Sequence, residues 1–260
     1  MVKVKDISSF NMDLFRVDGK VAIVTGAAVG IGRAYAVALA KAGADLFIVD
    51  LNPSRETRDL ILKEGRKAVY VEADLAVREN IDTVVQECIK AYGKIDILVN
   101  NAGIIKIAPL LEYSEKDWLK VIDVNVNAVF YLSKEVAKLM VSQGSGKIIN
   151  IGSMLSFQGS HNAVAYTTAR TAVLGMTRAF ASELAKNNVQ VNALCPGWIL
   201  SESGIQMFGE AKELAATIPV GRFGDPYDCM GSLIFLASEA SNYITGIALP
   251  IDGGYLIGGF

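Results

Sequence analysis

The chain has 260 residues, 52% of them hydrophobic, and its 25 basic and 27 acidic side chains leave a net charge of −2. This length favours one large domain with an ample core, and the balanced charge argues against nucleic acid as a partner. One histidine, and three cysteines without a CxxC motif, argue against a zinc site or a disulfide framework, so no metal is expected.

The N-terminal residues 1–15 carry charges of both signs among scattered apolar residues, without the continuous apolar stretch of a signal peptide. We expect them to form an extension that packs on the outside of the domain or on a neighbouring subunit. No run approaches the roughly 18 apolar residues of a membrane span. The sequence therefore predicts a cytoplasmic protein without a membrane partner.

Short apolar runs then alternate with longer alanine-rich segments. We expect strands over 21–25, 45–50, 68–72, 95–100, 147–152, 189–194 and 247–251, and helices over 31–42, 80–92, 115–141, 165–186 and 227–236. This alternation predicts βαβ units, and hence a single Rossmann-type, doubly wound α/β domain over residues 1–260, with a mostly parallel sheet of about seven strands flanked by helices on both faces. Residues 198–222 interrupt the alternation and are expected to form a lid over a substrate.

A glycine-rich loop, TGAAVGIG, follows the first expected strand and leads directly into a helix. Its first glycine permits a tight turn, its second lets the backbone approach a pyrophosphate, and its third allows close helix packing. The helix N-terminus offers free N–H groups to the anion. An ordinary glycine-rich turn is the alternative, which this context disfavours. The loop residues expected to bind a dinucleotide are Gly26, Val29, Gly30, Ile31 and Gly32.

Asp50 ends the second expected strand, 18 residues after the last glycine of the loop. An acidic residue about 20 residues past this motif typically binds the ribose hydroxyls. A 2′-phosphate would oppose Asp50 with nearly two negative charges, each costing about 4 kcal/mol at about 4 Å and an effective dielectric of about 20. The following Leu51 is uncharged. We therefore expect NAD as the cofactor, the alternative being that Asp50 is a solvated helix cap before Pro53.

Further motifs complete a pattern that spans residues 19–254. Asn100-Asn101-Ala102-Gly103 ends the fourth expected strand, Ser153 follows the fifth, Tyr166 comes 13 residues later, and Pro196-Gly197 follows the sixth. With the glycine loop, in this order, the chain resembles the short-chain dehydrogenase/reductases. Three segments, YSEKDW, GKIINIGSMLSFQG and DGGY, resemble the sugar-acid branch of that family, the gluconate 5-dehydrogenases and 2-deoxygluconate 3-dehydrogenases.

The resemblance implies an NAD-dependent oxidoreductase that interconverts a secondary alcohol and a ketone, with a small-molecule substrate. Removing the hydroxyl proton requires a base, and Tyr166 is the candidate. A tyrosine ordinarily ionises near pH 10, so a nearby cation is needed to make it basic enough. Ser153 would hydrogen-bond the substrate oxygen. Asn125 matches the asparagine that holds a water in the family, with Asn127 as the nearby alternative.

The chain departs from the family at one catalytic position. The YxxxK motif appears as Tyr166-Thr-Thr-Ala-Arg170, so arginine stands where the family has lysine. The spacing of four places both side chains on one helix face. Arginine keeps the charge, yet it cannot release a proton into a relay. Three interpretations follow: a working variant, a weakened enzyme, or a nucleotide-binding pseudoenzyme.

The resemblance also assigns more distant contacts. Tyr166 and Arg170 are expected to contact the cofactor as well as to act in catalysis. Additional cofactor contacts are expected from Leu51, Asp74, Leu75, Asn101, Ala102, Gly103, Pro196, Gly197 and Ile199. Substrate contacts are expected from Lys106, Met154, His161 and Trp198, although a solvated lysine and a surface histidine are the simpler interpretations of two of these.

The alanine-rich helices expected over 115–141 and 165–186 carry more apolar residues than one sheet face requires. The family pairs these helices between subunits, so a homotetramer built from dimers is expected, with burial inside one subunit as the alternative. A hydroxysteroid, an acyl chain or a small secondary alcohol are alternative substrates.

Overall fold

The structure is a computed structural model, and it describes residues 6–200 and 212–258. Its elements are β1 (Val21–Thr25), α1 (Gly30–Ala42), β2 (Asp45–Asp50), α2 (Arg55–Lys63), β3 (Ala68–Glu72), α3 (Arg78–Tyr92), β4 (Ile97–Asn100), α4 (Glu115–Ile122), α5 (Ala128–Gln143), β5 (Gly146–Ile151), α6 (Val164–Leu184), β6 (Val189–Pro196), α8 (Lys212–Ala216), α9 (Met230–Ala237), β7 (Ala248–Ile251) and α10 (Tyr255–Gly258). The 3-10 turns include η2 (Met12–Phe15), η5 (Met154–Ser156) and η8 (Glu239–Ser241).

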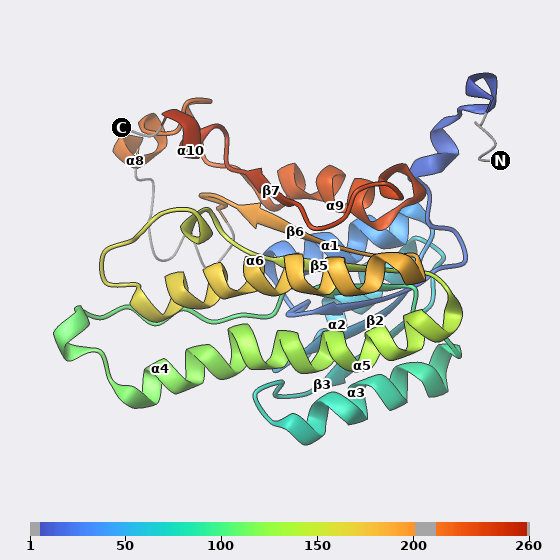
Figure 1. The fold of residues 1–260 in the computed structure, drawn as a ribbon, viewed down its shortest axis with the longest axis horizontal. Helices are drawn as coiled ribbons and strands as arrows, with labels where there is room; N and C mark the ends of the chain where they lie inside the picture. The colour runs from blue at the N-terminus through green and yellow to red at the C-terminus, as the bar shows by residue number, and fades with distance from the viewer. Residues whose placement is uncertain (1–5, 201–211, 259–260) are drawn as a thin grey trace.

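The strands form one seven-stranded sheet in the order β3-β2-β1-β4-β5-β6-β7, with every pair parallel. One core cluster joins α1 and α9 to one face of the sheet, and a second joins α3 and α5 to the other. Figure 1 shows α3, α5 and α6 on the face toward the viewer. Every residue of β1, β5 and β6 is buried, as expected of a parallel sheet covered on both sides.

The expected helix over 115–141 is wrong as a single α-helix. A π-helical segment, Asp123–Asn127, separates α4 from α5. Such a segment inserts an extra residue into a turn, which the spacing of apolar residues does not reveal. It is held from outside the helix, because the buried Asn125 side chain accepts a hydrogen bond from Ile104 N–H and donates one to Ile104 O.

The limits of β4, β5, β6 and β7 differ from the expected ones by one or two residues, while those of β1, β2 and β3 are as expected. The fourth strand begins at Ile97 instead of residue 95, because the Ile95 N–H donates to the Gln143 side chain and not to a neighbouring strand. The sequence reasoning also missed α2, a helix of nine residues that buries only Thr57 and Ile61.

The N-terminal extension, in its described part, packs on the C-terminal region, where the Phe15 and Phe235 rings lie 6.5 Å apart. Residues 201–211 of the expected lid lie outside the described residues. No helix within residues 6–200 and 212–258 is long and apolar enough to cross a membrane. All three cysteines are free, and burial raises the pKa of each thiol to about 12.

Candidate active site

A cleft of about 420 Å³ lies at the carboxyl ends of the strands, beside the point where the strand order reverses between β1 and β4. Ligands of doubly wound proteins bind in such a crevice. The cleft gathers residues that lie up to 98 positions apart in the sequence, from Gly26 to Val124. It is lined by the expected cofactor residues Gly26, Val29, Gly30, Ile31, Gly32, Asp50, Leu51, Asp74, Leu75, Asn101, Ala102 and Gly103.

The glycine loop fits a pyrophosphate by its backbone. Gly26 has a φ of +66°, and a Cβ at Gly32 would lie 2.0 Å from Gly26 O, so neither position accepts a side chain without distortion. The Val29 N-cap of α1 makes no side-chain cap hydrogen bond, which leaves the first N–H groups of the helix for an anion. The residues present therefore fit the diphosphate of a dinucleotide.

Residues that the sequence reasoning missed hold this loop in place. Thr57 Oγ1 donates to Ala27 O at 2.7 Å, and Arg33 Nη2 donates to Ala28 O at 2.6 Å. From the other side, Asn101 Nδ2 donates to Thr25 O and Gly26 O. The loop is thus shaped by its neighbours on α1, on α2 and after β4.

Asp50 points its carboxylate at the same loop. Oδ2 accepts from Ala28 N–H and Oδ1 accepts from Asn52 N–H, both at 2.9 Å. Because each carboxylate oxygen accepts more than one hydrogen bond, Asp50 keeps capacity for a hydroxyl ligand.

Ser153 is placed at the end of β5 by a short hydrogen-bonded turn. Its Oγ accepts from Leu155 N–H, and its own N–H donates to Ser156 Oγ, both at 3.1 Å. Ser156 Oγ in turn donates to Arg170 O at 2.7 Å. This chain of bonds joins η5 to α6, the helix that carries Tyr166 and Arg170.

The Arg170 guanidinium is enclosed, with 5% of the residue exposed. Nη1 donates to Ile151 O at 2.7 Å, and Cζ lies 5.1 Å from the centre of the Tyr166 ring. A Cβ added to Gly103 would lie 2.2 Å from Nη2 and 2.7 Å from Asn125 Oδ1. The guanidinium therefore fills the space between the end of β5, the Tyr166 ring and the cleft, beside Asn125.

The remaining expected residues lie apart from the cleft. Lys106 and His161 are exposed, and His161 lines a separate cavity of about 380 Å³ with Thr167 and Thr168. Trp198 and Ile199 line a third, of about 410 Å³, together with Asp252. Met154 is buried in η5, next to Ser153, while Pro196 and Gly197 lie where β6 ends.

Some residues of the cleft had no signal in the sequence. Among these are Asn52, Ala73, Ile104, Lys120 and Val124. Lys120 and Val124 come from α4 and the π-helical segment, where they read as ordinary helical residues.

The sheet order, the glycine loop at its switch point and the Ser153–Tyr166–Arg170 group define a dinucleotide-binding oxidoreductase. Comparison with known proteins agrees. Residues 26–256 match a family model described as Enoyl-(Acyl carrier protein) reductase. The chain is 41% identical, over 94% of its length and 98% of the relative's, to the 2-dehydro-3-deoxy-D-gluconate 5-dehydrogenase of Dickeya dadantii.

Solved structures are equally similar. A putative NAD(P)-dependent gluconate 5-dehydrogenase from Beutenbergia cavernae, with NADP bound at low occupancy, is 43% identical with a TM-score of 0.89, over 93% of this chain and 98% of that one. A gluconate 5-dehydrogenase from Burkholderia cenocepacia in complex with NADP and tartrate is 36% identical with a TM-score of 0.87, over 93% and 97%. The chain belongs to the short-chain dehydrogenase/reductase family and is an oxidoreductase acting on CH–OH groups.

Proposed function

We propose that the protein is an NAD-dependent dehydrogenase that interconverts a secondary alcohol and a ketone on a sugar acid such as gluconate or 2-keto-3-deoxygluconate. The observation that carries this proposal is the placement of the Arg170 guanidinium at 5.1 Å from the Tyr166 ring, on the helix that Ser156 joins to Ser153. The positive charge that a tyrosine base requires is thus present, despite the change from lysine.

The chemistry divides among a few side chains. The nicotinamide, when bound in the cleft, would accept or supply the two electrons. Tyr166 takes the proton from the substrate hydroxyl or returns it to the ketone oxygen. Ser153 donates a hydrogen bond to that oxygen and stabilises the charge that develops there. The Arg170 guanidinium lies 5.1 Å from the centre of the tyrosine ring and is shielded from water, so it supplies the positive charge of the site.

Arg170 also limits the reaction. A guanidinium does not release a proton in proteins, so Arg170 cannot pass a proton onward as a relay group would. The Asn125 carboxamide is held by Ile104 through one N–H and one lone pair, and the second N–H of Nδ2 and the second lone pair of Oδ1 remain. We therefore expect the Tyr166 proton to exchange with solvent through the substrate side of the site.

The choice of NAD rests on Asp50. Its carboxylate faces the loop that would hold the adenosine end, and the exposed neighbours Val29 and Leu51 are uncharged. Arg33 reaches the same loop, but it donates to Ala28 O and forms an ion pair with Glu56 at 2.8 Å. Two solved relatives contain NADP, which favours NADP over NAD. The preference between the two cofactors is therefore the first property to measure.

The sugar-acid substrate is supported by the names of the relatives and by the tartrate in one of them. We propose that residues 198–222 close over it, and that Lys106, Met154, His161 and Trp198 approach it. Met154 already adjoins Ser153 in η5, whereas Trp198 and His161 line two different cavities, which closure of the lid would bring toward Ser153.

The test is oxidation of NADH and of NADPH over a panel of keto sugar acids, ketosteroids, 3-oxoacyl esters and small ketones. It is run beside Arg170→Lys. We expect turnover of a keto sugar acid with NADH, at least tenfold above NADPH, and within tenfold of the lysine variant. Binding of NADH without turnover of any ketone, with activity only in Arg170→Lys, would indicate a pseudoenzyme. Turnover of a ketosteroid, an acyl ester or a small ketone alone would reassign the substrate.

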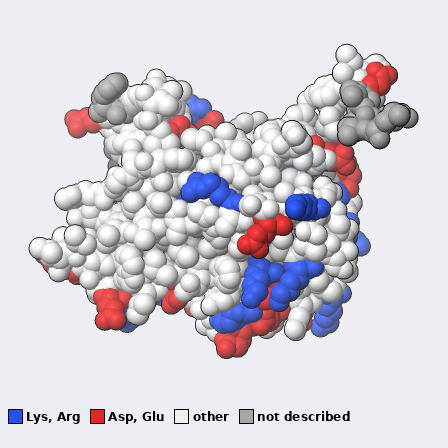
Figure 2. All heavy atoms as spheres, viewed as in Figure 1, with Lys and Arg blue, Asp and Glu red and all other residues white. Residues whose placement is uncertain are grey.

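We further propose a cytoplasmic homotetramer, with α5 at a subunit interface. Phe130 and Tyr131 of α5 expose more than a third of their surface, and Leu119 of α4 exposes 51%. Much of the face that carries these helices bears no charged side chain (Figure 2). The free, buried cysteines agree with a reducing compartment.

A further inference from the structure

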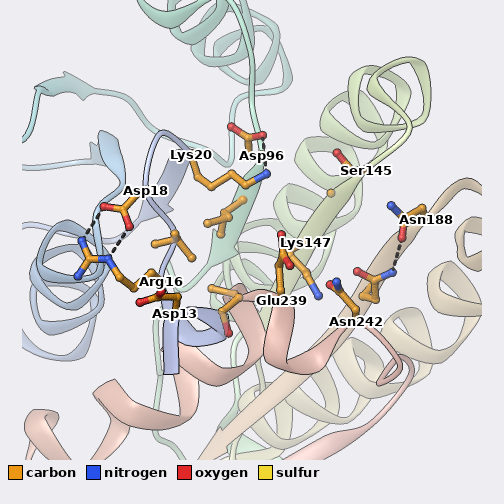
Figure 3. Close-up of a pocket in the computed structure, with 16 residues that line it drawn as sticks. Asp13, Arg16, Asp18, Lys20, Asp96, Ser145, Lys147, Asn188, Glu239 and Asn242 are labelled. Atoms are coloured by element: carbon orange, nitrogen blue, oxygen red, sulfur yellow. Dashed lines mark hydrogen bonds and ion pairs between the residues drawn. The ribbon is translucent and has the colours of Figure 1, made fainter. Parts of the chain in front are cut away.

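A second large cavity lies at the opposite end of the sheet from the dinucleotide cleft. Its volume is about 560 Å³, and it is bounded by the segment before β1, the first residues of β4, β5 and β6, and η8 after α9. Figure 3 shows the polar side chains that surround it. Because the glycine loop follows the other end of β1, this cavity is separate from the proposed active site.

Lys147, the second residue of β5, lines this cavity with only 8% of its surface exposed. Nζ donates to Ser241 Oγ at 3.2 Å, and within residues 6–200 and 212–258 no carboxylate pairs with it. The nearby Asp96 is engaged by Lys20 and Lys94. The largely buried ammonium group thus has one neutral hydrogen-bond partner in place of a counter-ion.

The charges around Lys147 come from several elements. Loss of hydration is the largest cause that lowers the pKa of Lys147 to about 8, and repulsion by Lys20 acts in the same direction. The attraction of Glu239 on η8 opposes the shift only in part. At pH 7.5 roughly a quarter of such amines are neutral, against about 0.1% of ordinary lysines. The other charged residues that line the cavity are Asp13, Arg16, Asp18 and Asp96.

We propose that this cavity is a second ligand site, in which the amine of Lys147 binds a small, uncharged hydroxyaldehyde as an imine. The Nζ lone pair forms a bond to the carbonyl carbon and gives a carbinolamine. The C–O bond then breaks, and the oxygen leaves as water with the two protons of the amine. The reaction is redox-neutral and needs no further reactant.

The lining of the cavity selects the class of ligand. Four carboxylates and two other cations remain once Lys147 is neutral, which disfavours anionic electrophiles such as acyl phosphates. The amide side chains of Asn188, Gln190 and Asn242 offer donors and acceptors to hydroxyl groups. An uncharged aldehyde that carries hydroxyls fits both properties.

The experiment uses the whole folded protein, glycolaldehyde as the probe, and cyanoborohydride to reduce the imine to a stable amine. Peptide mass spectrometry at pH 7.5 then compares Lys147 with Lys138, a helical lysine whose side chain is 61% exposed. We expect Lys147 to be labelled at least tenfold faster than Lys138, with a Lys147 rate that levels off above pH 8. Equal or slower labelling of Lys147 would overturn the proposal.

Two further measurements test whether the labelling depends on the surroundings of Lys147 and on the class of ligand. Glu239→Gln removes an attraction that favours the ammonium, so Lys147 labelling should become two- to threefold faster at pH 7.5 while Lys138 is unchanged. An unchanged Lys147 rate would contradict the proposed surroundings. Acetyl phosphate should show no preference for Lys147, and such a preference without one for glycolaldehyde would overturn the ligand class. NADH fluorescence confirms that each labelled protein remains folded.

Discussion

Gly103 and Arg170 are in close steric contact at the centre of the active site, where a side chain at residue 103 would collide with the guanidinium. The guanidinium Nη2 occupies the position where a side chain at residue 103 would begin, and the Nη1 bond to Ile151 O prevents it from swinging away freely. The arginine is therefore accommodated by the glycine of the loop after β4. A lysine, which ends in a single nitrogen instead of a planar fork, would leave more room at this point.

Gly103→Ala should accordingly lower kcat at least tenfold, because the new methyl group displaces the guanidinium from the Tyr166 ring. In an Arg170→Lys background the same change should cost several-fold less. Steady-state kinetics of the four proteins give both numbers, with Gly159→Ala as the control, since a Cβ there meets no atom within 4 Å. Equal losses in the two backgrounds would contradict the proposed coupling.

Lys147 should also affect stability as a function of pH. Its pKa falls from 10.5 to about 8 on folding, so the folded state pays for the buried charge below pH 8 and is relieved as the pH rises toward 10.5. Relative to Lys147→Met, the wild-type free energy of unfolding should rise by up to about 3 kcal/mol between pH 7.5 and 10.5. Urea unfolding of both proteins measures the difference, and a constant difference would refute the expectation.

At the scale of elements, β4 and β5 are locked in register by a buried polar pair. Asn100 and Asn150 face each other in the ladder, and Asn100 Nδ2 donates to Asn150 Oδ1 at 2.8 Å. Asn150 Nδ2 continues the network to Thr177 Oγ1 on α6. Because both strands lead into active-site loops, this network ties Asn101 on one side to Ser153 on the other.

Asn150→Leu should destabilise the protein by about 1–3 kcal/mol, since it removes the acceptor of Asn100 and the donor to Thr177 inside the core. Urea denaturation, monitored by circular dichroism, gives the value. Asn187→Leu, at an exposed position, is the matched control and should change the stability by less than about 0.5 kcal/mol. A similar small change for Asn150→Leu would show that the network contributes little.

The sequence predicts those elements whose pattern is set by burial. β1, β2 and β3 have the expected limits: in β1 and β2 a run of buried residues ends at a glycine or an acidic residue, and the half-buried β3 ends at Glu72. The π-helical segment and α2 were missed, since their causes lie in contacts with Ile104 and the glycine loop. For the same reason, motif spacing indicated the cleft glycines and Asp50 but not Thr57 or Arg33. These two side chains donate hydrogen bonds to carbonyls of the glycine loop, contacts that arise only in the folded chain.

At the scale of the molecule, the two helical layers differ. α1 and α9 pack on one face of the sheet, while α5 on the other presents Phe130, Tyr131 and Val141 to solvent. Phe130 is close to both Tyr131 and Phe180, with ring centres 5.4 and 5.9 Å apart. An exposed aromatic cluster of this kind is typical of an interaction site.

We therefore expect light scattering to give a mass about four times the 27.8 kDa of one chain. Phe130→Asp should yield smaller species, because it introduces a charge at the centre of the aromatic cluster. Leu62→Asp, on α2 and 48% exposed, should leave the assembly unchanged. A monomer in the unsubstituted protein, or an intact tetramer in Phe130→Asp, would contradict an interface at α5.

The three buried thiols offer a further use. Cys88 lies in one core cluster, Cys229 in the other, and Cys195 on β6 behind the active site. With each pKa near 12 and no exposure, the folded chain offers maleimides and disulfide reagents almost no thiolate. Each thiol therefore reacts only when the structure around it unfolds locally. The alkylation rates at the three positions would thus measure how often each helical layer opens, without any cysteine introduced by mutation.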